Sequence, residues 1–308
     1  MLETFDLKKV YKTKENEIAA VNGLNMKVEK GQIVGLLGMN GAGKTTTIKM
    51  LTTLLKPTSG KIVYDGIDSE KNLESIKRKI NVISGGDRGL YDRLTGMENL
   101  DYFGALYGVK DRQYKESLLE KVGLSHAATQ PVEQYSKGMK QRLKIAKGLL
   151  NNPDYLFLDE PTVGLDIIVS HDFREEINKM AHVDNKGIVL TTHYIAEAEE
   201  LCDYLYVIDH GMCIASGTIA ELKNLLKESS YSYNVIADAR LEQIQEVCFK
   251  LHAMAEKKGY EFEITSDQEI FQVLFEELSK ADISIRSIQK KEVTLDSVLY
   301  KLIEKKIK

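Results

Sequence analysis

Short apolar runs alternate with helical patterns over the large first part of the chain. Five of these runs are rich in β-branched and aromatic residues and too apolar for half-exposed strands, which predicts strands buried on both faces. The runs cover residues 33–37, 80–83, 155–158, 188–191 and 205–208. Strands that alternate with helices favour an α/β fold with a parallel sheet.

Helical patterns replace this alternation between residues 95 and 150. Thr95 and Glu98 have the spacing of a capping box ahead of an apolar helical stripe. Asp111 is placed to cap a second helix. We therefore expect a helical subdomain at about residues 95–150, inserted into the α/β domain.

Turn-forming residues divide the chain into two parts. Of the 22 glycines, 21 lie at or before Gly217, and all four prolines lie at or before Pro161. Turn-forming residues are therefore frequent in the first part of the chain and rare in the last part. We place the boundary near residues 225–227, which gives an α/β domain over 1–225 and a small accessory domain over 226–308.

The accessory domain also combines strand and helix signals, so we expect a small α/β domain. Alternation with period two over 231–235 and 262–264 predicts strands. Two apolar stripes at helical spacing predict helices, and we expect both stripes in the core. They consist of Ile244, Val247 and Leu251, and of Ile270, Val273, Leu274 and Leu278.

Composition and charge exclude several classes of protein. With 308 residues, 43% of them hydrophobic and 29% charged, the chain is long enough for a large core and is not mainly disordered. Its three cysteines match neither a disulfide framework nor a metal site. The net charge of −4 argues against nucleic acid as a partner. No run approaches the ~20 apolar residues of a membrane span, and the N-terminus predicts no signal peptide, so we expect a cytoplasmic chain.

The strongest local signal for chemistry follows the first predicted strand. The sequence there matches G-x-x-x-x-G-K-[ST], a glycine-rich loop whose N–H groups cradle phosphate oxygens. A helix from about residue 44 to 54 presents its positive N-terminal end to the same anion. Lys44 is expected to reach the β- and γ-phosphates, and the Thr45 hydroxyl to ligate Mg²⁺. The expected nucleotide-binding residues are Gly38, Met39, Asn40, Gly41, Ala42, Gly43, Lys44, Thr45 and Thr46.

Two acidic residues, Asp159 and Glu160, end the apolar run at 155–158. Carboxylates are poorly placed there unless they have partners, and the carboxyl edge of a parallel sheet is where α/β proteins bind ligands. We expect Asp159 to hold Mg²⁺, directly or through water, and Glu160 to act as general base on the attacking water.

Three further motifs complete a resemblance, over about the first domain, to the ATP-binding subunits of ATP-binding-cassette (ABC) transporters. Residues 135–139, Tyr-Ser-Lys-Gly-Met, resemble the ABC signature motif. Residues 161–166 resemble the D-loop, whose aspartate is Asp166. His193, 33 residues after Glu160, resembles the switch histidine.

The resemblance implies an ATPase that uses ATP and Mg²⁺. His193 would contact the γ-phosphate and help to orient Glu160 and the attacking water, so that Lys44, Glu160 and His193 form the catalytic group. Tyr11 stands where the family has an aromatic residue that stacks on adenine.

The resemblance also implies that two copies of the chain are needed. ATP would be held between the phosphate loop of one protomer and Ser136, Lys137 and Gly138 of the other, in a head-to-tail homodimer. Ser136 is independently placed as the N-cap of a helix over 139–150, and the N-terminus of a helix attracts anions.

A subclass is indicated by residues 293–302, which are similar to the closing helix of ATPases paired with ABC-2-type export permeases. An ordinary amphipathic helix capped by Thr294 is the simpler interpretation, and the two are compatible. The implied partner is an integral-membrane permease on a separate chain, contacted by the helical subdomain and residues 84–94. The chain would then lie peripherally on the inner face of the cell membrane.

The sequence departs from the family pattern in two places. Gly85 stands where the family has a glutamine that contacts Mg²⁺ and water and couples to the permease, so backbone, water, Ser84 or Asp87 takes its place, or hydrolysis is slower. Lys137 and Met139 replace the glycine and glutamine of the commonest signature, and Lys137 either adds charge near phosphate or points into solvent.

Two other functions are weighed against an exporter. A soluble ABC ATPase of translation or DNA maintenance usually has two cassettes or long coiled coils, whereas this chain has one cassette and no sustained heptads between Lys44 and Asp159. A nucleotide-gated regulator without hydrolysis is disfavoured because Glu160 and His193 are both present.

Overall fold

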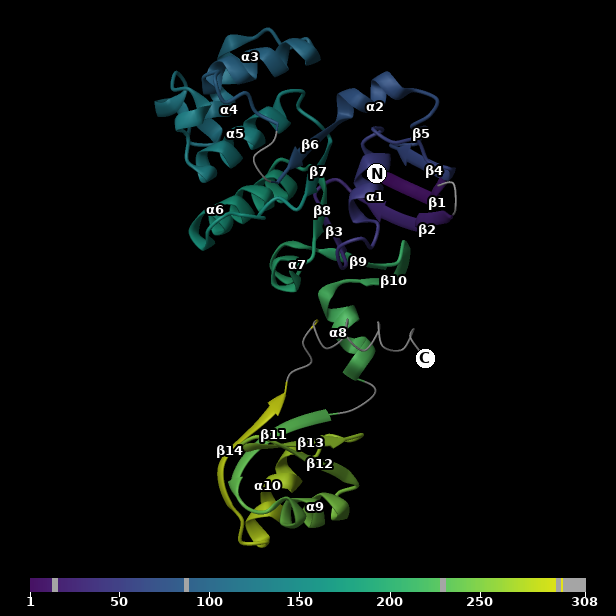
Figure 1. Cartoon of the computed structure of the whole chain (residues 1–308), viewed down its shortest axis with the longest axis vertical. Coiled ribbons are helices and arrows are strands. Elements are labelled where there is room, and N and C mark those ends of the chain that lie inside the picture. Colours follow the sequence, from purple (N-terminus) through teal and green to yellow (C-terminus); the bar gives the residue numbers. More distant parts are fainter. Residues whose placement is uncertain (13–15, 86–88, 228–230, 292–294, 296–308) are drawn as a thin grey trace. The chain divides into compact units, whose positions relative to one another are not determined.

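The computed structural model describes residues 1–12, 16–85, 89–227, 231–291 and 295. They form two compact units, Met1–Ile219 and Ala220–Lys308. The first unit holds two sheets and the second holds a third sheet (Figure 1). The division falls at the start of helix α8 (Ile219–Lys227), a few residues before the boundary that we expected near 225–227.

Six strands form the central sheet of the first unit, in the order β10-β9-β3-β8-β7-β6. Five of them run parallel, and β10 pairs antiparallel with β9 at the edge. The bounds are Ile33–Leu37 for β3, Ile80–Ser84 for β6, Tyr155–Asp159 for β7, Gly187–Thr192 for β8, Tyr204–Asp209 for β9 and Met212–Gly217 for β10. Every residue of β3 and β8 is buried, which confirms the prediction of strands covered on both faces.

An antiparallel sheet with the order β2-β1-β4-β5 packs against the central sheet. Its strands are β1 (Leu2–Lys12), β2 (Glu17–Val28), β4 (Ser59–Tyr64) and β5 (Ile67–Asp68). Leu2 and Val28 of this sheet share one hydrophobic core with Val34 and Phe157 of the central sheet. The core also includes Ile48 of the helix that follows the phosphate loop, so both sheets support that loop.

The two sheets are joined by a partly exposed polar contact at Asp65. Tyr155 of β7 donates a hydrogen bond to Asp65 Oδ1 (2.8 Å), and Lys79 Nζ is 2.7 Å from Oδ2. Tyr64 packs edge-on against Tyr155, with ring centroids 5.4 Å apart. Although partial burial opposes it, hydrogen bonds from Lys79, the N-terminal amine and Tyr155 hold the pKa of Asp65 well below its usual value.

We expect Asp65→Asn to lower the free energy of unfolding by about 2 kcal/mol at pH 7, because a hydrogen bond to a charged group is lost. A carboxyl whose pKa is lowered on folding stabilises the protein above its unfolded pKa of about 3.9, and this advantage disappears as the pH falls further. Urea unfolding at pH 7 and below pH 4 should therefore show a gap between wild type and variant that shrinks in acid. An unchanged gap would contradict this account.

The control for that experiment is Glu116→Gln. Glu116 forms an exposed ion pair with Arg112 one helical turn away, at 3.0 Å. Such surface pairs contribute less than about 1 kcal/mol, so this variant should unfold almost as the wild type does at both pH values.

Three helices form the subdomain predicted at 95–150. They are α3 (Gly96–Tyr107), α4 (Arg112–Lys121) and α5 (Lys137–Leu149). The capping box is present, since Thr95 N–H donates to Glu98 Oε2 (2.8 Å) and Glu98 N–H donates to Thr95 Oγ1 (3.2 Å). Asp111 accepts the Tyr114 N–H and caps α4, as predicted. The group packs beside β6, at the edge of the central sheet (Figure 1).

The remaining helices of the first unit flank the central sheet. They are α1 (Lys44–Leu51), α2 (Leu73–Lys79), α6 (Ile167–Asn178), which continues into a π-helical turn (Lys179–Val183), and α7 (Ile195–Leu201). Helix α1 ends at Leu51 and not at residue 54 as predicted, because Thr53 has φ 61° in the left-handed region and leaves the helix. None of the described helices is long and apolar enough to cross a membrane.

The second unit has the element order βαββαβ, with the antiparallel strand order β12-β13-β11-β14. The elements are β11 (Tyr231–Asp238), α9 (Leu241–Lys250), β12 (Ala253–Lys258), β13 (Glu261–Ser266), α10 (Phe271–Lys280) and β14 (Ser284–Lys291). Val273 was expected in the core but is 47% exposed, because the face of α10 that packs on the sheet carries Leu274 and Leu278. Apart from Leu295, the helix expected at 293–302, with its proposed cap Thr294, lies outside the described residues.

Candidate functional site

The glycine-rich loop joins the end of β3 to the start of α1. Gly43 has φ 108°, and a Cβ there would lie 2.2 Å from the Ala20 carbonyl oxygen, so only glycine fits. The buried Lys44 ammonium donates hydrogen bonds to the carbonyl oxygens of Gly38 (2.7 Å) and Met39 (3.1 Å). The cation therefore lies against the loop that is expected to hold phosphate.

Two effects act on the pKa of Lys44 in opposite directions. Burial lowers its pKa, while the nearby carboxylates of Glu160 and Asp159 oppose that change. Its Nζ is 3.9 Å from Glu160 Oε1 and only 5% of the residue is exposed. A phosphate that displaced the two loop carbonyls would give this buried ammonium a counter-charge at short range, which favours anion binding here.

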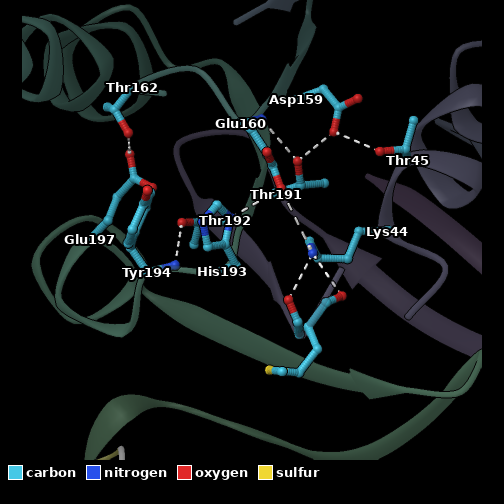
Figure 2. Close-up of polar contacts among 12 residues, drawn as sticks. Lys44, Thr45, Asp159, Glu160, Thr162, Thr191, Thr192, His193, Tyr194 and Glu197 are labelled. Carbon is cyan, nitrogen blue, oxygen red and sulfur yellow. Dashed lines mark hydrogen bonds and ion pairs between the residues drawn. The ribbon is translucent and has the colours of Figure 1, made fainter. Parts of the chain in front are cut away.

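Asp159 faces the start of α1 from the end of β7. Its Oδ1 accepts hydrogen bonds from the hydroxyls of Thr45 (3.3 Å) and Thr191 (2.6 Å), as Figure 2 shows. Hydroxyl and carboxylate oxygens suit Mg²⁺, which often uses one or two protein groups together with substrate phosphates. No cluster of three or more histidine, cysteine, aspartate or glutamate side chains in the described part of the chain could hold a metal by itself. Thr45 and Asp159 therefore fit Mg²⁺ that arrives with a nucleotide.

Glu160 meets His193 at the same edge of the sheet. His193 Nδ1 is 3.1 Å from Glu160 Oε1, and each side chain is about 30% exposed, so water can reach the pair. Glu160 has φ 47°, and its N–H is held by both the carbonyl and the hydroxyl oxygen of Thr191 (3.2 and 3.0 Å). Backbone strain of this kind costs about 1–3 kcal/mol and is concentrated at functional sites.

The end of β6 lies beside Asp159 and Glu160. Its contacts account for the glycine that stands where the family has a glutamine. Gly85 N–H donates to the Asp159 carbonyl oxygen (3.0 Å), and a Cβ on Gly85 would lie 2.1 Å from the Glu160 carbonyl oxygen. A glutamine therefore cannot replace Gly85 unless Glu160 moves. Ser84 pairs with Asp159 in parallel register, which puts both side chains on one face of the sheet. Asp87 lies outside the described residues.

The peptide after Glu160 is held by a residue that sequence analysis did not single out. Gln141 of α5 is 3% exposed, and its side-chain amide donates to the Pro161 carbonyl oxygen at 3.0 Å. Its only signal in the sequence is a polar residue one helical turn before Ile145, on the same side of α5. This bond links the helix of the signature motif to the loop that carries Glu160.

The signature residues form the start of α5. Ser136 Oγ accepts the Met139 N–H (3.2 Å) and caps the helix as predicted, which begins at Lys137 rather than 139. Lys137 is exposed, whereas Gly138 is buried so close to Val169 that a Cβ would lie 3.0 Å from its side chain. Within the described residues, no hydrogen bond or ion pair joins these residues to the phosphate loop, so the chain does not combine its two predicted anion sites by such a contact.

Two further predicted residues have local roles in the structure. Tyr11 of β1 is 40% exposed and pairs with Ile18 of β2, two residues from Ala20, whose carbonyl packs on the phosphate loop. Its ring is therefore on the strand pair that borders the loop. Asp166 accepts the Val169 N–H (2.9 Å) and caps α6.

Comparisons with known proteins agree on a single protein family. Residues 21–163 match the family described as "ABC transporter". The chain is 38% identical over 236 residues to the ABC transporter ATP-binding protein NatA of Bacillus subtilis, a match that covers 76% of this chain and 96% of that protein. It is 35% identical over 309 aligned positions to the daunorubicin/doxorubicin resistance ATP-binding protein DrrA of Streptomyces peucetius, covering 98% and 92%.

Solved structures give the same result for the fold. An ATP-binding subunit of an ABC transporter superposes with a TM-score of 0.64 at 31% identity, over 73% of this chain and 93% of that one. A dimeric ATP-binding cassette in a post-hydrolysis state, bound to ADP and Pi, superposes with a TM-score of 0.62 at 26% identity, over 71% and 98%.

Proposed function

Because the chain belongs to the family of ABC transporter ATP-binding proteins, we propose that it binds and hydrolyses ATP to power an ABC-2-type membrane exporter. The observation that carries the proposal is the meeting of Lys44, Thr45, Asp159, Glu160 and His193 at one edge of the central sheet. These residues come from the start of α1, the end of β7 and the loops that follow β7 and β8, and together they supply what phosphoryl transfer to water requires.

Each side chain has a defined part in hydrolysis. The Lys44 ammonium would leave the loop carbonyls and contact the β- and γ-phosphate oxygens, and Thr45 and Asp159 would hold Mg²⁺. The metal, when bound, neutralises the charge that develops on the phosphates. Glu160 accepts a proton from the attacking water, and His193, in contact with Glu160, fixes the carboxylate and contacts the γ-phosphate.

The second half of the ATP site comes from a second copy of the chain. Ser136, Lys137 and Gly138 form the N-terminus of α5, where helix N–H groups and the helix dipole attract an anion. A related cassette of known structure is a dimer. In the proposed head-to-tail homodimer each nucleotide lies between one phosphate loop and the partner's signature residues, and Tyr11 stacks on the adenine.

The proposed permease contact is an aromatic surface on the helical subdomain, defined by Tyr91, Tyr102, Phe103 and Leu106. Tyr91 and Tyr102 are 46% and 45% exposed, and Leu106 is 69% exposed. The rings of Tyr91 and Tyr102 pack edge-on, with centroids 4.7 Å apart, and Phe103 joins them. An exposed apolar patch of this kind is typical of a protein-binding surface. It includes part of the 84–94 segment, and a bound permease would hold the chain at the inner face of the membrane.

The exporter class follows from the relatives. DrrA is named for resistance to daunorubicin and doxorubicin, and its match extends over 98% of this chain, the second unit included. A soluble ATPase of translation or DNA maintenance has no comparable support. We therefore propose export as the direction of transport, without nucleic acid as a partner.

The test is capture of the permease from detergent-solubilised membranes of the native host with the tagged full-length chain. We expect a multi-spanning protein in about equal amount, and we expect Tyr102→Ser combined with Leu106→Asp to abolish its recovery. Val183→Asp, at a site 78% exposed in the first unit, is the matched control and should capture as the wild type does. A chain recovered without membrane protein, or with ribosomes or DNA, would overturn the exporter proposal.

A further inference from the structure

A second contact joins the two loops that carry the catalytic pair. The Thr162 hydroxyl donates a hydrogen bond to Glu197 Oε1 at 2.6 Å, and Figure 2 shows this contact on the far side of His193 from Lys44. Thr162 follows Glu160 by two residues, and Glu197 lies in α7, which begins two residues after His193. The two loops are therefore tied twice, once by Glu160 and His193 and once by Thr162 and Glu197.

Glu197 is buried, whereas a charged side chain that stabilises a protein from its surface is exposed. It is 4% exposed, and its other oxygen, Oε2, has no hydrogen-bond partner among the described residues. A buried carboxylate with an unsatisfied oxygen costs folding free energy. A carboxylate at this position therefore requires a reason other than stability.

The geometry of the loop after Glu160 supplies that reason. Glu160 has a positive φ, a backbone conformation that a non-glycine residue keeps only where the surrounding contacts hold it. Gln141 holds the Pro161 carbonyl from one direction, and Glu197 holds the Thr162 side chain from another. With both contacts in place, the two residues that follow the strained Glu160 backbone are each held by a hydrogen bond.

We propose that Glu197 is a positioning residue for ATP hydrolysis, which acts by holding Thr162 and thereby keeps Glu160 within reach of His193. This inference rests on the proposed ATPase function and adds to it a residue outside the motifs. Glu197 touches neither nucleotide nor water in this scheme. Its effect is on the fraction of molecules in which the Glu160 and His193 side chains are correctly paired.

The test compares three variants of the full chain by steady-state ATPase assays. Thr162→Val removes the hydroxyl at nearly constant volume and should lower kcat about tenfold, the scale of one hydrogen bond to a charged group, with KM for ATP nearly unchanged. Thr162→Ser keeps the hydroxyl and should restore kcat. Glu200→Gln is the control, because Glu200 lies on the same helix, is half exposed and pairs with Arg174 instead.

A fourth measurement distinguishes the positioning of Glu160 from a purely structural role of the contact between Thr162 and Glu197. In a His193→Ala background, single-turnover hydrolysis should be slowed no further by Thr162→Val, because the pairing that it protects is already lost. Additive losses, an unchanged kcat for Thr162→Val, or a fall in Tm with equal loss of ATP affinity would overturn the inference. If the wild-type chain itself does not hydrolyse ATP, the proposed function fails instead, so the two failures are distinguishable.

Discussion

Replacing Glu160 with glutamine is expected to lower ATP hydrolysis by about 10²–10⁴-fold, the range of general-base catalysis, and to leave an ATP-bound dimer. The amide has the shape of the carboxylate but cannot accept the proton of the attacking water. The phosphate loop and its lysine are untouched, so ATP should still bind. In the proposed homodimer the γ-phosphate would bridge the two protomers until hydrolysis releases it, so the dimer should persist.

This expectation is checked by size-exclusion chromatography with Mg²⁺ and ATP, together with an ATPase assay. Glu175→Gln, at an exposed position on α6, is the matched control and should hydrolyse ATP and return to monomers. An E160Q chain that stays monomeric with saturating ATP would contradict the proposed homodimer. An E160Q chain that hydrolyses normally would remove Glu160 from the role of general base.

Lys44→Ala is expected to weaken ATP binding by roughly 100-fold, which corresponds to the loss of two charge-assisted hydrogen bonds to phosphate. The Lys44 ammonium is already buried and held against the loop carbonyls of Gly38 and Met39. Little side-chain entropy is therefore lost when phosphate replaces those carbonyls. Alanine removes the ammonium group that donates both of these hydrogen bonds to the loop.

Isothermal titration with ATP measures this effect. Lys49→Ala is the control, because Lys49 is exposed on the same helix and its loss should leave the affinity unchanged. Thermal unfolding of both variants shows whether the loop itself survives. Unchanged affinity for the folded Lys44→Ala chain would contradict the assignment of the phosphate site.

The central sheet and the phosphate loop could be predicted from the sequence because their signals are local. Buried parallel strands are apolar along their whole length, as Ile33–Leu37 is, and a phosphate loop needs glycines at fixed spacing. The sequence signal for the capping box at Thr95 is equally local. The position of His193 relative to Glu160 followed from the family resemblance, because the 32 residues between them carry no local signal for that contact.

The antiparallel sheet of the first unit was not predicted, for a physical reason. Strand β1 changes register three times against β2, between Thr4 and Leu7, between Leu7 and Lys8, and between Lys9 and Val10. Each shift interrupts the alternation of buried and exposed side chains, and so erases the period-two pattern from the sequence. The strand then shows charged residues where a regular strand would show a clear apolar face.

Contacts between distant loops could not be predicted either. Thr162 lies in the segment that resembles the D-loop and Glu197 lies outside the motifs, and the sequence does not indicate that they meet. The parallel pairing of β7 with β8 brings their loops together. Gly85 is a similar case. The sequence shows that a glutamine is absent, whereas its cause, the Glu160 carbonyl oxygen 2.1 Å from where a Cβ would stand, exists only in the folded chain.

The bond between Gln141 and Pro161 has a consequence for how the two ATP sites of the proposed dimer respond to each other. Helix α5 presents its N-terminus to the nucleotide of the partner, while Pro161 adjoins the carboxylate that serves the chain's own nucleotide. Nucleotide binding at one site of the proposed dimer would therefore be transmitted to the catalytic loop of the other site through this hydrogen bond. By two-fold symmetry the same bond acts in the opposite direction, so any coupling between the two sites of the proposed dimer is reciprocal.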